Sequence, residues 1–129
     1  MVNIVYTSNW LSGNMKSFFS KHDITQKQFN IMRILKGAGE PVSTSYIKER
    51  MLDRNSDVSR IVDRMNEKTW IRKSTCPHDK RLVDVELTPK GIDKLNELNS
   101  HLEGADIYLS KLNNEEINLL NRLLDKIRE

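Results

Sequence analysis

The sequence predicts a mainly α-helical protein with one small β-hairpin, an α+β fold organised as a single domain over residues 1–129. Three observations support this prediction. The length is that of one ordinary domain. Leu, Ile and Val recur at helical spacings through most of the chain. Residues 83–87 instead alternate apolar and polar side chains, which is the pattern of a half-buried strand.

Two helices are expected in the first part of the chain. Residues 4–20 carry the apolar bulk of the first helix, although Gly13 weakens it. The second helix begins at Thr25, whose hydroxyl can accept from the Gln28 amide while the Gln28 side chain reaches back, as in a capping box. Gly39 ends it, because glycine readily adopts the left-handed conformation common after a helix.

An extended stretch and two more helices follow. Residues 40–42 are expected to be extended, since the residue before Pro41 avoids the helical region. Ser43 is a candidate N-cap for a short helix over residues 44–52. The next helix is expected over residues 56–68.

A hairpin and two C-terminal helices complete the predicted fold. Residues 70–75 and 82–87 are expected to be strands that meet at a polar loop over residues 76–81. Thr88 and Pro89 begin a long helix as its N-cap and first residue. Its apolar stripe is Ile92, Leu95, Leu98, Leu102, Ala105 and Leu109. The final helix follows a cap at Asn113 and Glu116, and its apolar face is Ile117, Leu120, Leu123, Leu124 and Ile127.

This order of elements is a helix-turn-helix followed by a β-wing. The winged helix-turn-helix core is expected over residues 25–87, flanked by helices at about 4–20 and 89–128. The flanking helices carry more apolar surface than so small a core can cover. A second copy of the chain is therefore expected to cover them, which makes them dimerisation helices.

Positive charge is concentrated in the middle of the chain. The formal net charge is only +3. Residues 48–81 hold 10 basic and 6 acidic side chains, whereas residues 82–129 hold 6 basic and 10 acidic ones. The asymmetry favours a face that binds a polyanion. On charge alone, chance scatter over a solvated surface explains it equally well.

The helix over residues 56–68 is the candidate DNA-reading helix. Its apolar residues fall on one face at the spacing i, i+3, i+4, i+7, and they are Val58, Ile61, Val62 and Met65. The opposite face is small and polar, then basic, and consists of Ser56, Ser59, Arg60, Asp63 and Arg64. Small hydroxyls allow close approach to DNA, and arginine binds guanine or phosphate. The alternative is a solvated face on which Asp57 and Asp63 pair with Arg60.

The hairpin tip carries the second basic feature. Asp79, Lys80 and Arg81 stand at a tight turn between the two strands. A basic tip on a rigid hairpin can reach a phosphate or a narrow minor groove, whose negative potential attracts arginine. We expect Asp79 to orient Arg81 rather than to contact DNA. The alternative is an ordinary turn with solvated charges.

These segments resemble the MarR family, the multiple-antibiotic-resistance regulators. The resemblance is carried by Pro41-Val42-Ser43-Thr44-Ser45-Tyr46-Ile47, by Asp57-Val58-Ser59-Arg60-Ile61-Val62-Asp63-Arg64-Met65, and by Asp79-Lys80-Arg81-Leu82-Val83-Asp84-Val85-Glu86-Leu87-Thr88-Pro89-Lys90-Gly91. It implies a homodimeric winged helix-turn-helix regulator of transcription, acting as a repressor on a pseudo-palindromic operator. One departure is Thr69, which stands where the family usually has glycine before the first wing strand.

The resemblance also implies partners and site residues. Double-stranded DNA and a second copy of the chain are the expected partners, and a small-molecule effector is expected to release the DNA. The expected DNA-binding residues are Ser43, Thr44, Ser45, Asn55, Ser56, Asp57, Ser59, Arg60, Arg64, Lys73, Lys80 and Arg81. The competing hypothesis is a winged-helix adaptor that binds proteins and has lost sequence-specific DNA binding.

An effector pocket has four aromatic candidates. Trp10, Phe18, Phe19 and Phe29 either line such a pocket or form plain core. The lone Cys76 lies beside Lys73 and His78, so it is either a reactive thiol or a passive one.

Other classes of function are not expected from the sequence. No nucleophile elbow, P-loop or dinucleotide fingerprint occurs, which argues against an enzyme. The Cys and His spacings suggest no metal site, and we expect no cofactor. No apolar run is long enough to span a membrane. A single cysteine and the lack of a signal-peptide pattern favour the reducing cytoplasm.

Overall fold

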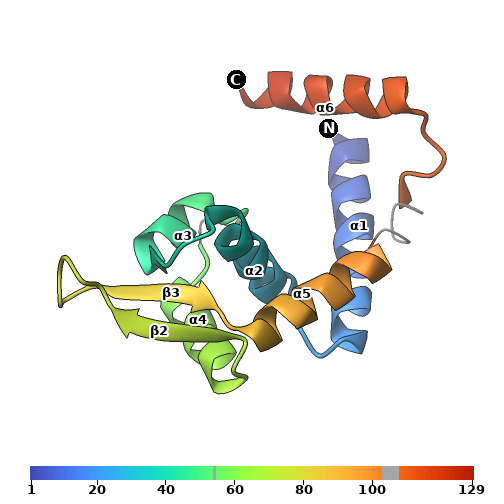
Figure 1. The fold of residues 1–129 in the computed structure, drawn as a ribbon. Coiled ribbons are helices and arrows are strands. Elements are labelled where there is room, and N and C mark those ends of the chain that lie inside the picture. The colour runs from blue at the N-terminus through green and yellow to red at the C-terminus, as the bar shows by residue number, and fades with distance from the viewer. Residues whose placement is uncertain (54, 103–107) are drawn as a thin grey trace. The chain divides into compact units, whose positions relative to one another are not determined.

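The computed structural model describes residues 1–53, 55–102 and 108–129. The chain divides into two compact units, Met1–Leu98 and Asn99–Glu129. The first unit contains a helical core with a small sheet at one side (Figure 1). In chain order its elements are α1 (Val2–Lys21), α2 (Gln26–Ala38), β1 (Val42–Ser43), α3 (Thr44–Arg50), α4 (Val58–Glu67), β2 (Ile71–Thr75), β3 (Val83–Leu87) and the first turns of α5 (Pro89–Leu102).

The ends of α2 are fixed by the side chains that the sequence predicts. The Thr25 hydroxyl accepts from the Gln28 amide at 3.1 Å, and the Gln28 side chain accepts from the Thr25 amide at 3.0 Å, which confirms the capping box. At the other end Gly39 has φ 70°, and its amide donates to the Leu35 carbonyl at 3.3 Å. These caps satisfy backbone groups at both ends of α2 and thereby fix where the helix begins and ends.

One boundary of α3 and one of α4 differ from the predicted ones by two residues. The N-cap of α3 is Ser43, as predicted, with its hydroxyl accepting from the Tyr46 amide at 3.2 Å, but the helix ends at Arg50 and not at residue 52. Helix α4 begins at Val58 and not at Ser56, because Asp57 is the N-cap and its carboxylate accepts from the Arg60 amide at 3.2 Å. Ser56 therefore lies before the helix.

The sheet has three antiparallel strands in the order β1-β3-β2. The predicted hairpin is confirmed to within one residue at each strand, with Ile71 opposite Leu87 and Thr75 opposite Val83. Strand β1 was expected only to be extended, and it pairs with β3 through Val42 and Val85. The predicted half-buried pattern of β3 holds only in part: Val85 is fully buried, whereas Val83 is exposed because it lies near the tip of the wing.

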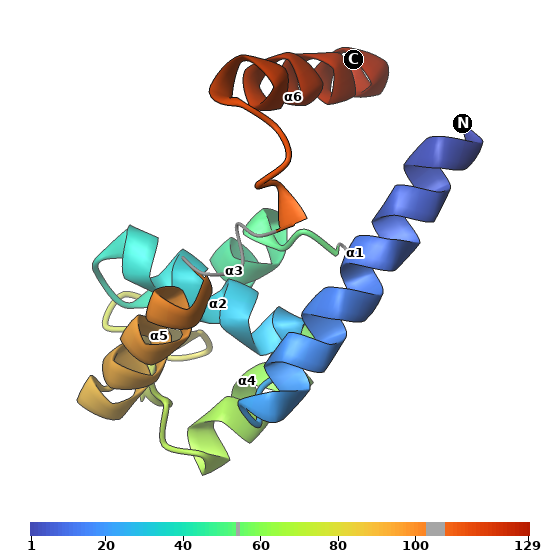
Figure 2. The ribbon, with the colours of Figure 1, turned by 90° about the vertical axis from the view of Figure 1, so that its right-hand side faces the viewer.

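The core of the first unit lies where the helices meet the sheet. Val58, Val62 and Met65 on α4 are buried as predicted, and Ile61 is half-buried. The largest fully buried side chains are Phe19, Ile31, Met32, Ile47, Met65, Ile71, Leu95 and Leu98, with Val62 and Val85. The N-terminal half of α1 extends beyond this core, as Figure 2 shows, and its apolar side chains Val2, Ile4, Val5, Tyr6 and Trp10 are exposed.

The exit from α4 has an unusual backbone. Thr69 follows the C-cap residue Lys68 and has φ 61°, in the left-handed region that usually belongs to glycine. Its amide donates to the Asn66 carbonyl at 2.9 Å, and the Trp70 amide donates to the Met65 carbonyl at 3.1 Å, which is the Schellman pattern. A β-branched residue in this conformation costs on the order of 1–3 kcal/mol.

The second unit contains the end of α5 and α6 (Asn114–Arg128). The predicted cap of α6 is confirmed: the Asn113 amide donates to Glu116 at 2.9 Å, and the Glu116 amide donates to Asn113 at 3.0 Å. The apolar face of α6 is exposed, including Leu119, Leu120 and Leu123. The predicted long helix is wrong at its end, because Leu109 lies in a turn and not in a helix, while Ala105 lies outside the described residues. Among the described helices, none is both long and apolar enough to span a membrane.

Candidate nucleic-acid interface

The outer face of α4 presents polar and basic side chains to solvent. Ser59, Arg60 and Arg64 are exposed, as expected from their positions opposite the buried stripe. The N-cap places Asp57 at the first turn, where its carboxylate is engaged by the Arg60 amide. Arg60 and Arg64 lie one turn apart on this face. The face can therefore bring two guanidinium groups to a groove or to phosphates.

Asp63 has a role that the sequence hypothesis missed. We expected it to offset Arg60, but its carboxylate pairs with the Lys73 ammonium of β2 at 2.6 Å. This ion pair joins the outer face of α4 to the first wing strand. Lys73 is one of the expected DNA-binding residues, so part of its charge is directed toward α4. The sequence could not predict this ion pair, because Asp63 and Lys73 are ten residues apart and belong to different elements.

Among the expected DNA-binding residues that precede α4, fewer side chains are exposed than predicted. Ser45 and Asn55 are exposed, and Thr44 is half-buried. The Ser43 hydroxyl is engaged as the N-cap of α3. Ser56 is only 5% exposed, which corrects its expected place on the outer face of the reading helix. The reason is the later start of α4, which turns Ser56 inward.

The tip of the wing is organised around Asp79. Its carboxylate accepts from the Arg81 amide at 3.0 Å and from the Arg81 guanidinium at 3.2 and 3.4 Å. The expected pairing of the two side chains is therefore confirmed in geometry. The Arg81 side chain remains 91% exposed. The amide of Arg81, followed by its guanidinium, lowers the pKa of the Asp79 carboxyl below its usual range.

Three further contacts stabilise the hairpin. The Cys76 amide donates to the Leu82 carbonyl at 3.0 Å, and the Leu82 amide donates to the Asp79 carbonyl at 2.9 Å. Arg72 pairs with Glu86 at 2.6 Å across the strands, where the two residues are directly opposite.

The four aromatic effector candidates do not share one environment. Phe19 and Phe29 are buried, with ring centroids 5.1 Å apart, so they belong to the core. Phe18 contacts Phe19 edge to face at 5.2 Å. Trp10 is exposed on α1. A hollow of about 500 Å³ lies elsewhere, and it is lined by Ser20, Asp23, Ile24, Thr25, Gln28, Arg64, Glu67 and Lys68.

The remaining reactive side chains do not form a cluster. Cys76 is a half-buried free cysteine beside the wing tip. Within the described part of the chain, no group of three or more His, Cys, Asp or Glu side chains could hold a metal ion. The basic surface of α4 and the wing is thus the strongest candidate site that the structure offers.

A helix pair followed by a braced, basic hairpin defines the class of winged helix-turn-helix proteins that bind DNA. Residues 24–83, which hold most of the candidate site, match the sequence model of the MarR family. The multiple antibiotic resistance protein MarR of Salmonella typhimurium is 30% identical over 116 residues, which cover 88% of this chain and 79% of that protein. The chain belongs to the MarR family of transcription regulators.

Solved structures show the same fold. A mutant MarR from E. coli, complexed with operator DNA, superposes with a TM-score of 0.83 at 23% identity and covers 97% of this chain and 91% of that one. The organohalide-sensing regulator RdhR, bound to 2,4-dichlorophenol, superposes with a TM-score of 0.86 at 22% identity, covering 98% of this chain and 76% of that one.

Proposed function

We propose that the protein is a homodimeric transcriptional repressor that reads a pseudo-palindromic operator. Helix α4 enters the major groove, and the wing over residues 76–81 enters the adjacent minor groove. The observation that carries the proposal is the tip of the wing, where Asp79 orients the exposed side chain of Arg81. A fixed arginine at the end of a rigid hairpin suits a narrow minor groove.

The proposed major-groove contacts come from the exposed face of α4. Ser59 and Arg60 lie near the N-terminus of the helix, which enters the groove first in helix-turn-helix proteins. Arg64, one turn later, is placed for a phosphate. Ser45 and Asn55 supply the flanking contacts, and Ser56 is left out because it is buried. In a symmetric dimer the two copies of α4 would lie about 34 Å apart, in successive major grooves.

We propose repression rather than activation. A dimer that occupies two successive grooves within a promoter would block access of the transcription machinery. The operator complex of the related E. coli MarR supports DNA as the partner. The proposed role for this chain therefore combines its own basic surface with the behaviour of a structural relative.

The decisive experiment isolates the operator and then removes the wing arginine. Bound fragments are selected from fragmented genomic DNA and sequenced, and affinities are measured by fluorescence polarisation. Arg81→Ala should weaken binding about tenfold to a hundredfold and reduce discrimination for AT-rich flanks. The matched control is Lys36→Ala, which removes one positive charge from the exposed end of α2. Equal affinity of Arg81→Ala and Lys36→Ala would contradict the minor-groove contact.

Salt dependence separates the proposal from the adaptor hypothesis. If several phosphates are contacted, affinity for the operator should fall by about a thousandfold or more between about 50 and 200 mM salt. A protein-binding adaptor without sequence-specific DNA binding would yield no enriched sequence in the selection. No enrichment would replace the repressor proposal by the adaptor, and a flat salt response with a selected operator would contradict the proposed phosphate contacts.

We also propose that a small organic molecule weakens the complex with DNA. RdhR binds 2,4-dichlorophenol. In this chain the hollow beside α4 includes Arg64, so an occupant there would compete with a proposed phosphate contact. Titration of the DNA complex with 2,4-dichlorophenol should release DNA, and Gln28→Leu should lower the sensitivity. Release with unchanged sensitivity in Gln28→Leu would place the ligand elsewhere.

A further inference from the structure

The exit of α4 sets the direction in which the wing leaves the DNA-reading helix. Thr69 is the residue at this exit, between the last turn of α4 and the buried Trp70 that precedes β2. Its φ of 61° places a β-branched side chain in a conformation that such residues rarely adopt. Contacts from the surroundings must therefore hold Thr69 in this conformation.

The start of α5 is pressed against the same exit. Gly91 is buried, and a Cβ atom on it would lie 1.9 Å from the Trp70 carbonyl oxygen. The Thr88 hydroxyl donates to the Thr69 carbonyl at 2.6 Å, and the Thr88 amide donates to the Trp70 carbonyl at 3.0 Å. This close approach brings the first turn of α5 within reach of the Thr69 side chain.

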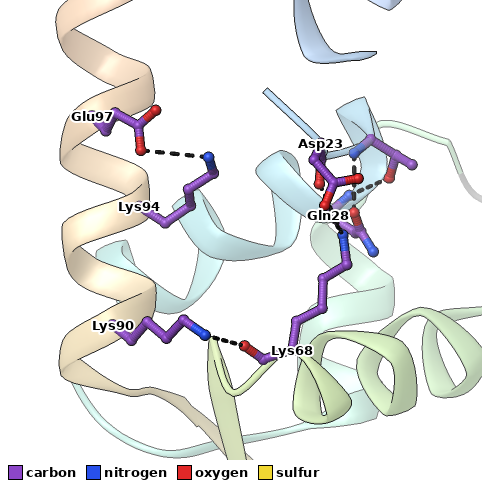
Figure 3. Close-up of polar contacts among 7 residues, drawn as sticks. Asp23, Gln28, Lys68, Lys90, Lys94 and Glu97 are labelled. Carbon is purple, nitrogen blue, oxygen red and sulfur yellow. Dashed lines mark hydrogen bonds and ion pairs between the residues drawn. The ribbon is translucent and has the colours of Figure 1, made fainter. Parts of the chain in front are cut away.

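From the first turn of α5, the Lys90 side chain reaches the residues at the end of α4. Its ammonium group donates to the Thr69 hydroxyl at 3.0 Å and to the Lys68 carbonyl at 3.1 Å. The Thr69 hydroxyl donates in turn to the Lys68 carbonyl at 2.6 Å. A cation at the carbonyl end of α4 is also favoured by the helix dipole. Figure 3 shows Lys90 directed at the Lys68 backbone, one turn before Lys94, which is directed instead at Glu97.

The Lys68 side chain anchors the same point to the other side of the unit. Its ammonium donates to the Asp23 carbonyl at 2.9 Å and to the Asp23 carboxylate at 3.2 Å, and it lies 4.5 Å from the Trp70 ring centroid. The α1–α2 turn, the end of α4 and the start of α5 thus meet at Lys68 and Thr69. A shift of Thr69 would rotate β2 relative to α4.

From these contacts we infer that Lys90 is a positioning residue for DNA binding. Its ammonium group holds Thr69 in the left-handed conformation and thereby fixes the angle between α4 and the wing. This inference rests on the proposed function, because the angle matters only if both elements contact one DNA site. Lys90 is needed because Thr69 occupies a position that glycine would occupy without strain.

A double-mutant cycle tests the inference. The four proteins are the unmodified chain, Lys90→Met, Thr69→Gly and the double variant, and Lys94→Met is the control that removes a neighbouring lysine of α5. For each protein the affinity is measured for the selected operator and for the same operator with its AT-rich flanks replaced by GC. The ratio of the two affinities reports the placement of the wing and is independent of the folded fraction.

Lys90→Met is expected to lower the ratio of the two affinities mainly when Thr69 is present. Lys90→Met should lower the ratio about threefold to tenfold when Thr69 is present, and less than about twofold in the Thr69→Gly background, where no strain needs to be held. Lys94→Met should leave it unchanged. An equal loss in both backgrounds would overturn the inference, since Lys90 would then act on DNA directly. No loss in either background would overturn it as well.

Unfolding in urea gives a second cycle that needs no DNA. Lys90→Met should lower the midpoint of unfolding more than about twice as much with Thr69 present as in the Thr69→Gly background. Equal shifts would overturn the hold of Lys90 on Thr69. If the unmodified chain selects no DNA, the proposed function fails and the positioning role fails with it, whereas unchanged flank discrimination in Lys90→Met overturns the inference alone.

Discussion

At the tip of the wing, Arg81 supplies a positive charge and Asp79 fixes the orientation of its side chain. Arg81 is almost fully exposed, which makes it available to DNA but also mobile in principle. Asp79 removes part of that freedom by engaging both the amide and the guanidinium of Arg81. A side chain that is ordered before binding loses less entropy when it binds. The carboxylate near the tip is therefore compatible with a polyanion partner.

The titration of Asp79 tests this arrangement. Its folded-state pKa lies below the value in the unfolded chain, because Arg81 donates hydrogen bonds to the carboxylate. The hold on Arg81 is thus complete above the unfolded pKa of about 4 and is lost only as the pH falls through the lower folded value. We expect a ¹³C NMR titration to give a depressed midpoint for Asp79. In Arg81→Ala the midpoint should rise only in part, because the backbone amide at position 81, which is the larger cause of the shift, still donates to the carboxylate. An ordinary midpoint in the unmodified chain would contradict the pairing.

At the scale of elements, the sequence predicts those helix ends and strands that depend only on residues close together in the chain. The capping boxes at Thr25 and Asn113 were predictable because each needs residues only three positions apart. The hairpin was predictable because alternation and a polar turn lie within one short stretch. The start of α4 was missed because Ser56 and Asp57 are both good N-cap residues, and only the fold decides which of them caps the helix.

Features that depend on residues far apart in the chain could not be predicted from the sequence. Strand β1 forms because Val42 pairs with Val85 of β3, and no local sequence pattern predicts a two-residue strand. The pair between Asp63 and Lys73 likewise requires α4 to lie against β2. The buried position of Ser56 follows from the same tertiary packing. In the candidate site, the residue types could be predicted from the sequence, but the contacts that orient Lys73 could not.

Gly91 offers a test of how closely α5 and the wing exit are packed. Gly91→Ala should destabilise the protein by about 2 kcal/mol or more, because the new Cβ would meet backbone atoms of Trp70 that cannot move away easily. The control is Gly37→Ala in α2, where nothing lies within 4 Å and alanine should stabilise the helix by about 0.5 kcal/mol. Urea unfolding measures both, and equal midpoints for the two variants would contradict the close approach.

At the scale of the whole molecule, each of the two units carries a helix with exposed apolar side chains. In the first unit, the N-terminal half of α1 exposes Val2, Val5 and Tyr6. In the second unit, α6 has no buried residue along its 15 residues. An isolated helix of this length is marginal in water, and amphipathic helices gain most of their stability from packing. In the proposed homodimer, a symmetric second copy of the chain would cover both of these apolar faces.

Leu123 is the residue through which this dimer can be tested. It is 49% exposed on the apolar face of α6, and a lysine there would place a charge in the proposed interface of both copies. Each copy loses about 2 kcal/mol of apolar burial, so Leu123→Lys should weaken dimerisation by about a thousandfold. The control, Asn121→Lys, adds the same charge at an exposed polar position of the same helix.

Sedimentation equilibrium decides between the outcomes. The unmodified chain and Asn121→Lys should have the mass of two chains of 15.1 kDa, whereas Leu123→Lys should have the mass of one. Leu123→Lys should also lose most of its affinity for a two-half-site operator, because a single reading helix makes only half of the contacts. It should keep its affinity for an isolated half-site, because the DNA-reading surface lies in the first unit and the substitution in the second. A dimeric Leu123→Lys, or a monomeric unmodified chain that still binds the full operator tightly, would contradict the proposed assembly.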